Sequence, residues 1–302
     1  MMTLGYGGSL FILAFDHRGS FQKKFFGIAG APNVEETATI ADAKTVIYEG
    51  FQIAIAAGAP RDAAGILVDE QFGADIVRAA KTASLMFAMP VEKSGQNEFD
   101  FQYGDEFGKH IEEFDPTFNK VLVRYNTEGD EEMNDRQAAR LKELSDWLHA
   151  NDRKFLFELL VPAEDAQLAQ VDGDTDRFDK ELRPALMRKA IVDLLAAGIE
   201  PDIWKIEGID KREDCEIISA ATREGGREGV VCVVLGRGAD DTAVDHWLRQ
   251  GAWVPGYVGF AIGRTIWWDP LKAFVDGTLP REDAAERISR NYLRFIDVYT
   301  KG

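Results

Sequence analysis

The sequence is poor in cysteine, histidine and long hydrophobic runs, and each shortage excludes a class of structure. Only two of the 302 residues are cysteines, Cys215 and Cys232, so neither a disulfide nor a metal-binding pair is expected. This low cysteine content fits a reducing compartment, and we therefore expect a cytoplasmic location. The four histidines lack ligand-like spacing, so we expect no metal. The apolar run 10–15 is too short to span a membrane and no cleavage site follows it, so neither membrane nor secretion is expected.

Positive charge is also scarce. Lys and Arg together number 35 against 52 Asp and Glu, which gives a formal net charge of −17. Such a chain repels polyanions, so nucleic acid is not an expected partner. Any phosphate ligand must instead be held by a local cluster of cations. The content of 45% hydrophobic residues is sufficient for a substantial core.

Short apolar runs alternate with amphipathic stretches along the whole chain. The eight strand candidates are Leu10–Asp16, Gly65–Asp69, Leu85–Val91, Lys120–Asn126, Phe155–Val161, Ile203–Ile209, Val230–Gly236 and Tyr257–Ile262. Helical patterns lie between them, at Glu36–Ala57, Asp135–Ala150, Pro184–Ala197 and Lys211–Arg223, and a closing helix is expected at Asp283–Tyr299. Strict alternation predicts a parallel sheet, and eight units predict an α/β fold of the (β/α)8 TIM-barrel type, one domain over residues 1–302. Longer loops are expected at 93–103 and 163–180.

Lys205 is the residue that points most clearly to chemistry, because it interrupts an apolar strand. A buried ammonium group is costly, and desolvation lowers the pKa of a lysine. A neutral amine attacks carbonyl carbons to form a Schiff base, so we expect carbonyl chemistry of the aldolase type. The alternative is a structural ion pair with Glu158 or Glu207.

Other polar residues occur where the expected strands end, which is the catalytic edge of such barrels. They are Asp16, His17 and Arg18, then Asp69, Lys120, Arg124, Glu158, Glu207 and Arg237. Because side chains alternate along a strand, Glu158 and Lys205 are expected to face each other inside the barrel, with Glu158 as acid and base. This chemistry requires no cofactor. Several residues also have structural alternatives: Asp16 and Asp69 as helix caps, Arg18 as a partner of an acidic neighbour, and Lys120 as a residue too deep to reach the mouth.

The last two expected strands are followed by glycine and arginine. Gly236, Arg237 and Gly238 follow the seventh strand, and Gly263 and Arg264 follow the eighth. Glycine backbone N–H groups, a helix start and guanidinium groups all favour phosphate. A phosphate site is therefore expected here. The tryptophans of the segment Trp253–Trp268 are interpreted as packing or as a contact in a homo-oligomer.

Four segments resemble the class I aldolases related to tagatose-1,6-bisphosphate aldolase. They are Phe15-Asp16-His17-Arg18-Gly19, Phe157-Glu158-Leu159, Trp204-Lys205-Ile206-Glu207-Gly208 and Gly263-Arg264-Thr265-Ile266-Trp267-Trp268-Asp269-Pro270. The resemblance covers nearly the whole chain and is greatest to the aldolase-like domain of bifunctional inositol-catabolism kinases. It implies Lys205 as the Schiff-base lysine, Glu158 as acid and base, and Asp16 and Lys120 as further polar groups. It also implies Arg264 and the Gly263 backbone as phosphate ligands.

The resemblance implies a phosphorylated sugar as the partner and cleavage of 2-deoxy-5-keto-D-gluconate 6-phosphate to dihydroxyacetone phosphate and malonate semialdehyde. The chain departs from the tagatose enzymes at His17, where glutamine is expected, and at Arg237. A carboxylate on the substrate would suit Arg18, Arg124 or Arg237. Tagatose 1,6-bisphosphate and a sulfofructose phosphate are alternative substrates. A phospho-sugar-binding barrel without catalysis, and an isomerase that uses Glu158 without an imine, are alternative functions.

Overall fold

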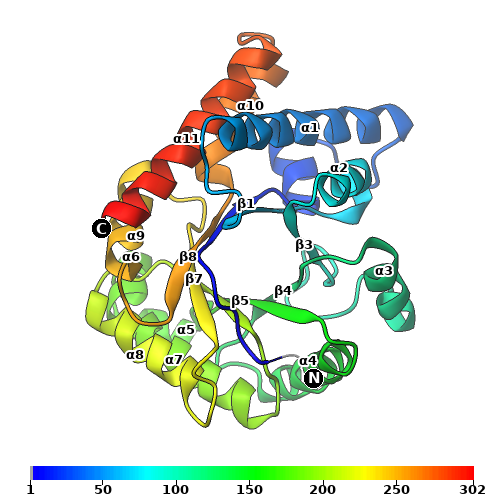
Figure 1. The fold of residues 1–302 in the computed structure, drawn as a ribbon. Helices are drawn as coiled ribbons and strands as arrows, with labels where there is room; N and C mark the ends of the chain where they lie inside the picture. The colour runs from blue at the N-terminus through cyan, green and yellow to red at the C-terminus, as the bar shows by residue number, and fades with distance from the viewer. Residues whose placement is uncertain (1–2) are drawn as a thin grey trace.

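The strands pair in parallel and in chain order, and the eighth strand closes the barrel against the first (Figure 1). The structure is a computed structural model and describes residues 3–302. The strands are β1 Leu10–Ala14, β2 Ala64–Leu67, β3 Met86–Pro90, β4 Phe118–Arg124, β5 Lys154–Leu160, β6 Ile203–Glu207, β7 Val231–Leu235 and β8 Tyr257–Ile262. The predicted (β/α)8 barrel is confirmed.

Alternation along each strand divides the apolar side chains between two cores. On β1, Leu10 and Ile12 point into the barrel and belong to the inner core. Phe11 and Leu13 point outward and belong to the core between the sheet and the helices. The inner core fills the barrel at the amino-terminal ends of the strands. Inward-facing side chains nearer the carboxyl ends can therefore form a polar site.

Helices surround the sheet and cover the outward-facing residues (Figure 1). They are α1 Val34–Ala56, α2 Glu70–Thr82, α3 Phe107–Phe114, α4 Glu131–Ala150, α5 Asp165–Gln170, α6 Thr175–Arg177, α7 Arg183–Ala196, α8 Arg212–Arg223, α9 Asp241–Gly251, α10 Arg264–Val275 and α11 Arg281–Lys301. Three shorter helical segments are η1 Phe21–Phe25, η2 Gly104–Glu106 and η3 Phe178–Leu182. Side chains cap some of the helix starts, and on α1 Asn33 forms a capping box with Glu36.

Some predicted boundaries and loops are wrong. The fourth strand runs over Phe118–Arg124, two residues earlier than expected, which places Lys120 inside the strand. The segment 163–180 is not a plain loop, because α5, α6 and the start of η3 lie within it. Segment 93–103 is irregular as predicted, and a bridge between Glu92 and Phe101 joins its ends.

The tryptophan segment does not form one surface patch. Trp267 is fully buried, and its indole Nε1 donates to the Ala14 carbonyl oxygen at 2.9 Å. It therefore packs inside the molecule and is unavailable for a subunit contact, whereas Trp253 is exposed. Both cysteines lie in the outer core as free thiols. Within residues 3–302 we find no helix with the length and apolar character of a membrane span.

Candidate active site

The carboxyl ends of the strands surround a cavity of about 340 Å³. All of the candidate site residues predicted from the sequence except Asp69 line it: Asp16, His17, Arg18, Lys120, Arg124, Glu158, Lys205, Glu207, Gly236, Arg237, Gly238, Gly263 and Arg264. The strands converge at this edge, so residues separated by up to 248 positions in the sequence line one space. The cavity is the candidate active site.

Lys205 and Glu158 form a buried ion pair at the bottom of the cavity. They are register partners on β6 and β5, so their side chains project at the same height. Lys205 Nζ donates to Glu158 Oε2 at 2.9 Å, and the two residues are only 3% and 5% exposed. The predicted proximity of this amine and this carboxylate is confirmed.

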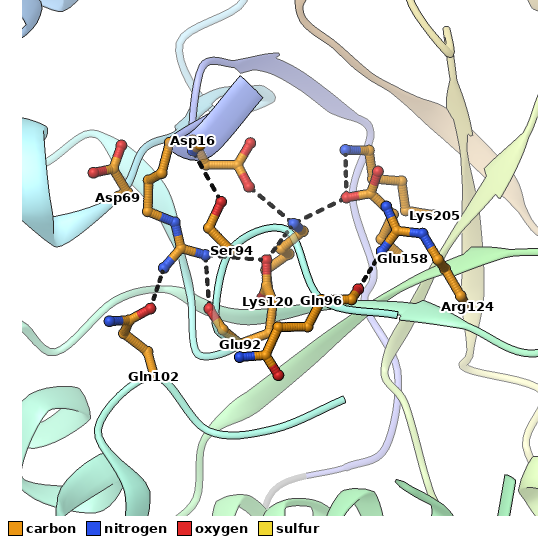
Figure 2. Close-up of polar contacts among 12 residues, drawn as sticks. Asp16, Asp69, Glu92, Ser94, Gln96, Gln102, Lys120, Arg124, Glu158 and Lys205 are labelled. Atoms are coloured by element: carbon orange, nitrogen blue, oxygen red, sulfur yellow. Dashed lines mark hydrogen bonds and ion pairs between the residues drawn. The ribbon is translucent and has the colours of Figure 1, made fainter. Parts of the chain in front are cut away.

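Lys120 is the centre of a larger network (Figure 2). From β4 its Nζ reaches Asp16 Oδ2 at 2.8 Å, Glu92 Oε1 at 2.9 Å and Glu158 Oε2 at 3.1 Å. Lys120 is 1% exposed but lines the cavity, so it is not too deep to reach it. Asp16 pairs with this lysine, and among the described residues it accepts no helix-capping bond.

This network separates the two lysines electrostatically. Burial opposes the charge on Lys120, but attraction to Asp16, Glu158 and Glu92 outweighs it and raises the pKa of Lys120. Burial likewise disfavours ionised Asp16 and Glu158, but the combined attraction of neighbouring cations, Lys120 foremost and Lys205 also contributing, outweighs burial and lowers the pKa of both carboxyls. Lys120 is therefore a fixed cation with three carboxyl neighbours, whereas Lys205 contacts only the Glu158 carboxylate among the described residues.

One end of the cavity is cationic. Arg264, the first residue of α10, donates to the Arg237 carbonyl oxygen at 2.6 Å, and no carboxylate among residues 3–302 pairs with it. Burial lowers the pKa of this guanidinium. Lys24, from η1, lines the same end and has no hydrogen bond or ion pair within the described chain. Two cations without carboxylate partners at a helix N-terminus suit a phosphate group.

Glycine is required at this end by close packing. A Cβ added to Gly263 would lie 2.2 Å from the Ala14 carbonyl oxygen. Gly238 has φ +73°, and a Cβ there would lie 2.5 Å from Cζ of Arg264. Larger residues would therefore shift the arginine or the start of α10.

Arg237 and Glu207 are already paired with protein groups. The Arg237 guanidinium pairs with Asp179 and, through Nε, with Glu207 Oε1 at 3.1 Å. Glu207 Oε2 accepts the Val161 N–H at 2.9 Å and lies 3.7 Å from Arg183 Nη1. Both residues line the cavity, but these contacts with protein groups favour a structural role over direct ligand binding.

The other two predicted arginines differ in the same way. Arg18 donates to the Glu92 carbonyl oxygen at 2.7 Å and to Gln102 Oε1 at 3.1 Å. It is therefore held beside the acidic residue Glu92, in agreement with the structural alternative given for Arg18 above. Arg124 donates only to the Gln96 carbonyl oxygen, at 2.8 Å, and meets no carboxylate among the described residues (Figure 2). Arg124 is therefore the better candidate for a second anionic group.

His17 lies between the carboxylate network and the cationic end. Burial, which outweighs attraction to Asp16, lowers the pKa of His17 to about 4. Its Nδ1 is buried and has no partner within residues 3–302, and its ring packs edge-on against Trp267. A neutral imidazole at this position can exchange hydrogen bonds with a ligand but adds no charge at neutral pH.

Asp69 serves the scaffold. Its Oδ2 accepts the Phe72 N–H at 2.9 Å and caps α2, which confirms the helix-cap alternative given for Asp69 in the sequence analysis. Its other oxygen pairs with Lys44, which also donates to the Phe15 carbonyl oxygen at 2.8 Å. The pair therefore fixes the backbone directly before Asp16.

Sequence reasoning missed Glu92 and Lys24. Glu92 shares the inward parity of Met86 and Ala88 but lies two residues after β3, just beyond the end of the strand predicted over Leu85–Val91. Lys24 belongs to η1, which the apolar pattern does not reveal. Extending the parity of each strand by two residues would have found Glu92. No cluster of three His, Cys, Asp or Glu side chains arranged for a metal ion occurs in residues 3–302.

Solved structures similar to this chain share its fold at low sequence identity. A Schiff-base-forming fructose-1,6-bisphosphate aldolase is 13% identical, with a TM-score of 0.54 over 95% of this chain and 94% of that one. An archaeal fructose 1,6-bisphosphate aldolase is 12% identical, with a TM-score of 0.57 over 98% and 95% of the two chains. A protein of Corynebacterium glutamicum is 17% identical, with a TM-score of 0.55 over 97% and 88%.

No curated protein matches the chain. A family profile matches residues 6–302, which is nearly the whole sequence. The chain therefore belongs to the family described as "Uncharacterized protein conserved in bacteria (DUF2090)".

Proposed function

We propose that this protein is a class I aldolase that cleaves a phosphorylated keto sugar or keto-deoxy sugar acid through a Schiff base on Lys205. The observation that carries the proposal is the buried Lys205–Glu158 pair at 2.9 Å in the cavity. The attacking amine has to be uncharged, and Glu158 is positioned to accept its proton. The fold shared with a Schiff-base-forming aldolase supports the same reaction class.

The mechanism uses three of the network residues. Lys205 Nζ attacks the ketone carbon, and Glu158 gives the proton that it took from the lysine to the carbinolamine hydroxyl, which leaves as water and yields a protonated imine. Glu158 removes the proton from the substrate hydroxyl beside the bond that breaks, and the electron pair of that bond flows to the imine nitrogen as the aldehyde leaves. The enamine is then protonated at carbon, and water releases the ketone and the free lysine. The Lys120 ammonium stabilises negative charge on the substrate oxygens throughout.

The cations without carboxylate partners favour a substrate that is anionic at both ends. Lys24 and Arg264 suit the phosphate, and Arg124 suits a carboxylate or second phosphate. We propose 2-deoxy-5-keto-D-gluconate 6-phosphate as the substrate, with dihydroxyacetone phosphate and malonate semialdehyde as the products. Tagatose 1,6-bisphosphate and a sulfofructose phosphate fit the same description and are the alternatives.

A turnover panel of these three phosphorylated compounds tests the proposal. The native protein is expected to cleave at least one, the Lys205→Met variant none, and the Lys142→Met variant all that the native protein cleaves. Lys142 is a matched control because it lies on α4 and pairs with Asp146, outside the cavity. Cleavage retained by Lys205→Met would contradict the imine mechanism, and binding without cleavage by the native protein would favour the non-catalytic barrel.

A further inference from the structure

Glu92 is a buried carboxyl group in the cavity to which the mechanism above gives no role. It follows β3 by two residues, keeps the inward parity of that strand and is 6% exposed. In the barrel β3 lies opposite β7, since the strands pair in chain order around a ring of eight. Glu92 is therefore across the cavity from the loop after β7 that carries Gly238 at the phosphate end.

The two carboxylate oxygens of Glu92 have different surroundings. Oε1 accepts from Lys120 at 2.9 Å and lies 3.5 Å from Arg18 Nη2 (Figure 2). Oε2 is buried and has no hydrogen-bond partner among residues 3–302. Leaving a buried oxygen unpaired is unfavourable, so a ligand that satisfied it would gain affinity.

The electrostatic setting of Glu92 differs from that of its carboxylate neighbours. Asp16 on the β1 side and Glu158 on β5 are held ionised by Lys120, despite their burial. At Glu92, burial outweighs the attraction of Lys120 and Arg18, and Asp16 adds repulsion, so the pKa of Glu92 is raised. Carboxyl groups whose pKa values are pushed apart within one site commonly divide the acid and base roles.

We propose that Glu92 is a specificity-determining residue that donates a hydrogen bond from a neutral carboxyl group, through Oε2, to an oxygen on the aldehyde half of the substrate. The inference rests on the proposed aldolase function and extends it. Lys205, on β6, takes the ketone carbon, and Lys24 and Arg264 take the phosphate. The remaining half of the substrate then extends past Glu158 and Lys120 toward the ends of β3 and β4, where Glu92 and Arg124 line the cavity.

A purely structural role for Glu92 predicts different behaviour. A counter-ion for Lys120 and Arg18 must be negatively charged, so glutamine would fail there as badly as alanine. A neutral donor is replaced well by glutamine, because the amide N–H takes the place of the carboxyl O–H. The two substitutions therefore separate the two roles.

The first test compares Glu92→Gln and Glu92→Ala on 2-deoxy-5-keto-D-gluconate 6-phosphate and tagatose 1,6-bisphosphate. Glu92→Gln is expected to keep KM within about 3-fold, and Glu92→Ala to raise it about 10- to 100-fold, as the loss of one buried hydrogen bond implies. Glu113→Gln, on the exposed face of α3, is the control. Equal losses in both Glu92 variants would overturn the proposal.

Borohydride trapping with dihydroxyacetone phosphate separates this inference from the proposed function. That ketone lacks the aldehyde half, so both Glu92 variants are expected to form the Lys205 adduct as the native protein does. Loss of the adduct in both variants would mean that Glu92 supports the imine site itself and would overturn the proposal. Absence of the adduct in the native protein would instead refute the aldolase function.

Infrared difference spectroscopy tests the neutral carboxyl without turnover. The native protein is expected to show the carbonyl stretch of a protonated carboxyl group at the assay pH, and Glu92→Gln to lack it. A spectrum without this band, or a band that persists unchanged in Glu92→Gln and therefore comes from another group, would contradict the donor role.

Discussion

At the level of single residues, the two buried lysines of the site differ in the number of acidic side chains that they contact. Lys120 has three carboxyl neighbours, and attraction led by Asp16 and Glu158 keeps it protonated. Lys205 shares one carboxylate, Glu158, which can receive its proton. The same distinction applies to the arginines, because Arg237 is neutralised by Asp179 and Glu207 whereas Arg264 has only a carbonyl partner.

Removing Arg264 is therefore expected to impair phosphate binding more than removing Arg237. The Arg264→Gln variant should raise KM for a phosphorylated ketose about 10- to 100-fold, because a charge-assisted hydrogen bond contributes about 1.5–3 kcal/mol. Arg237→Gln should raise it several-fold less, with circular dichroism confirming that both variants are folded. Steady-state kinetics that rank the two variants in the opposite order would contradict the assignment of the phosphate end.

His17 gives a prediction for pH. Its folded pKa of about 4 lies below the ordinary histidine value of 6.5, so between these values the unfolded chain binds a proton that the folded chain does not. The contribution of His17 to the free energy of unfolding therefore falls as pH decreases from about 6.5 toward 4. Denaturant unfolding at about pH 7 and pH 5 should show a steeper loss for the native protein than for His17→Gln. Parallel losses would mean that the imidazole is not desolvated.

At the level of elements, the site depends on how the segments after the strands are anchored. The segment after β1 is fixed from behind by Lys44 on α1, which binds the Phe15 carbonyl oxygen and Asp69. The segment after β3 is closed on itself by the Glu92–Phe101 bridge, and the Arg140 guanidinium holds it at the Phe99 carbonyl oxygen. These contacts position Asp16 and Glu92 before any ligand binds.

The buried Lys44–Asp69 ion pair is expected to matter for stability chiefly because removing one partner leaves the other charge unpaired. Both residues are fully buried, so Lys44→Met leaves an unpaired carboxylate and should lower the free energy of unfolding by about 3–5 kcal/mol. The double variant Lys44→Met/Asp69→Asn removes both charges and keeps an oxygen to cap α2, so it should recover most of that loss. Urea denaturation measures all three proteins. A single variant as stable as the native protein would show that the pair contributes nothing.

Secondary-structure elements were predicted well where the strand-helix unit repeats along the sequence, and poorly in segments that lie outside this repeat. Alternating apolar runs predicted all eight strands, because a parallel barrel buries both faces of each strand. The short helices of segment 163–180 have no apolar period of their own and were predicted as loop. Pairing of charges is also hidden, since Asp179 neutralises Arg237 from 58 positions away. Parity predicted Glu158 beside Lys205, but no local signal distinguishes a free arginine from a paired one.

At the scale of the whole molecule, an acidic protein carries a site with a cationic end. The net charge of −17 repels anions at a distance, so a phosphorylated substrate is held by short-range contacts with Lys24 and Arg264. The barrel makes this possible because the carboxyl ends of its eight strands meet at one edge. There the lysines of β4 and β6 share Glu158, from the strand between them.

The central claim is that Lys205, and not Lys120, attacks the substrate. The most direct measurement is borohydride reduction in the presence of dihydroxyacetone phosphate, followed by peptide mapping of the adduct by mass spectrometry. We expect one adduct, on the peptide that contains Lys205, and none in Lys205→Met. An adduct on Lys120, or no adduct at a ligand concentration that saturates binding, would contradict the central claim.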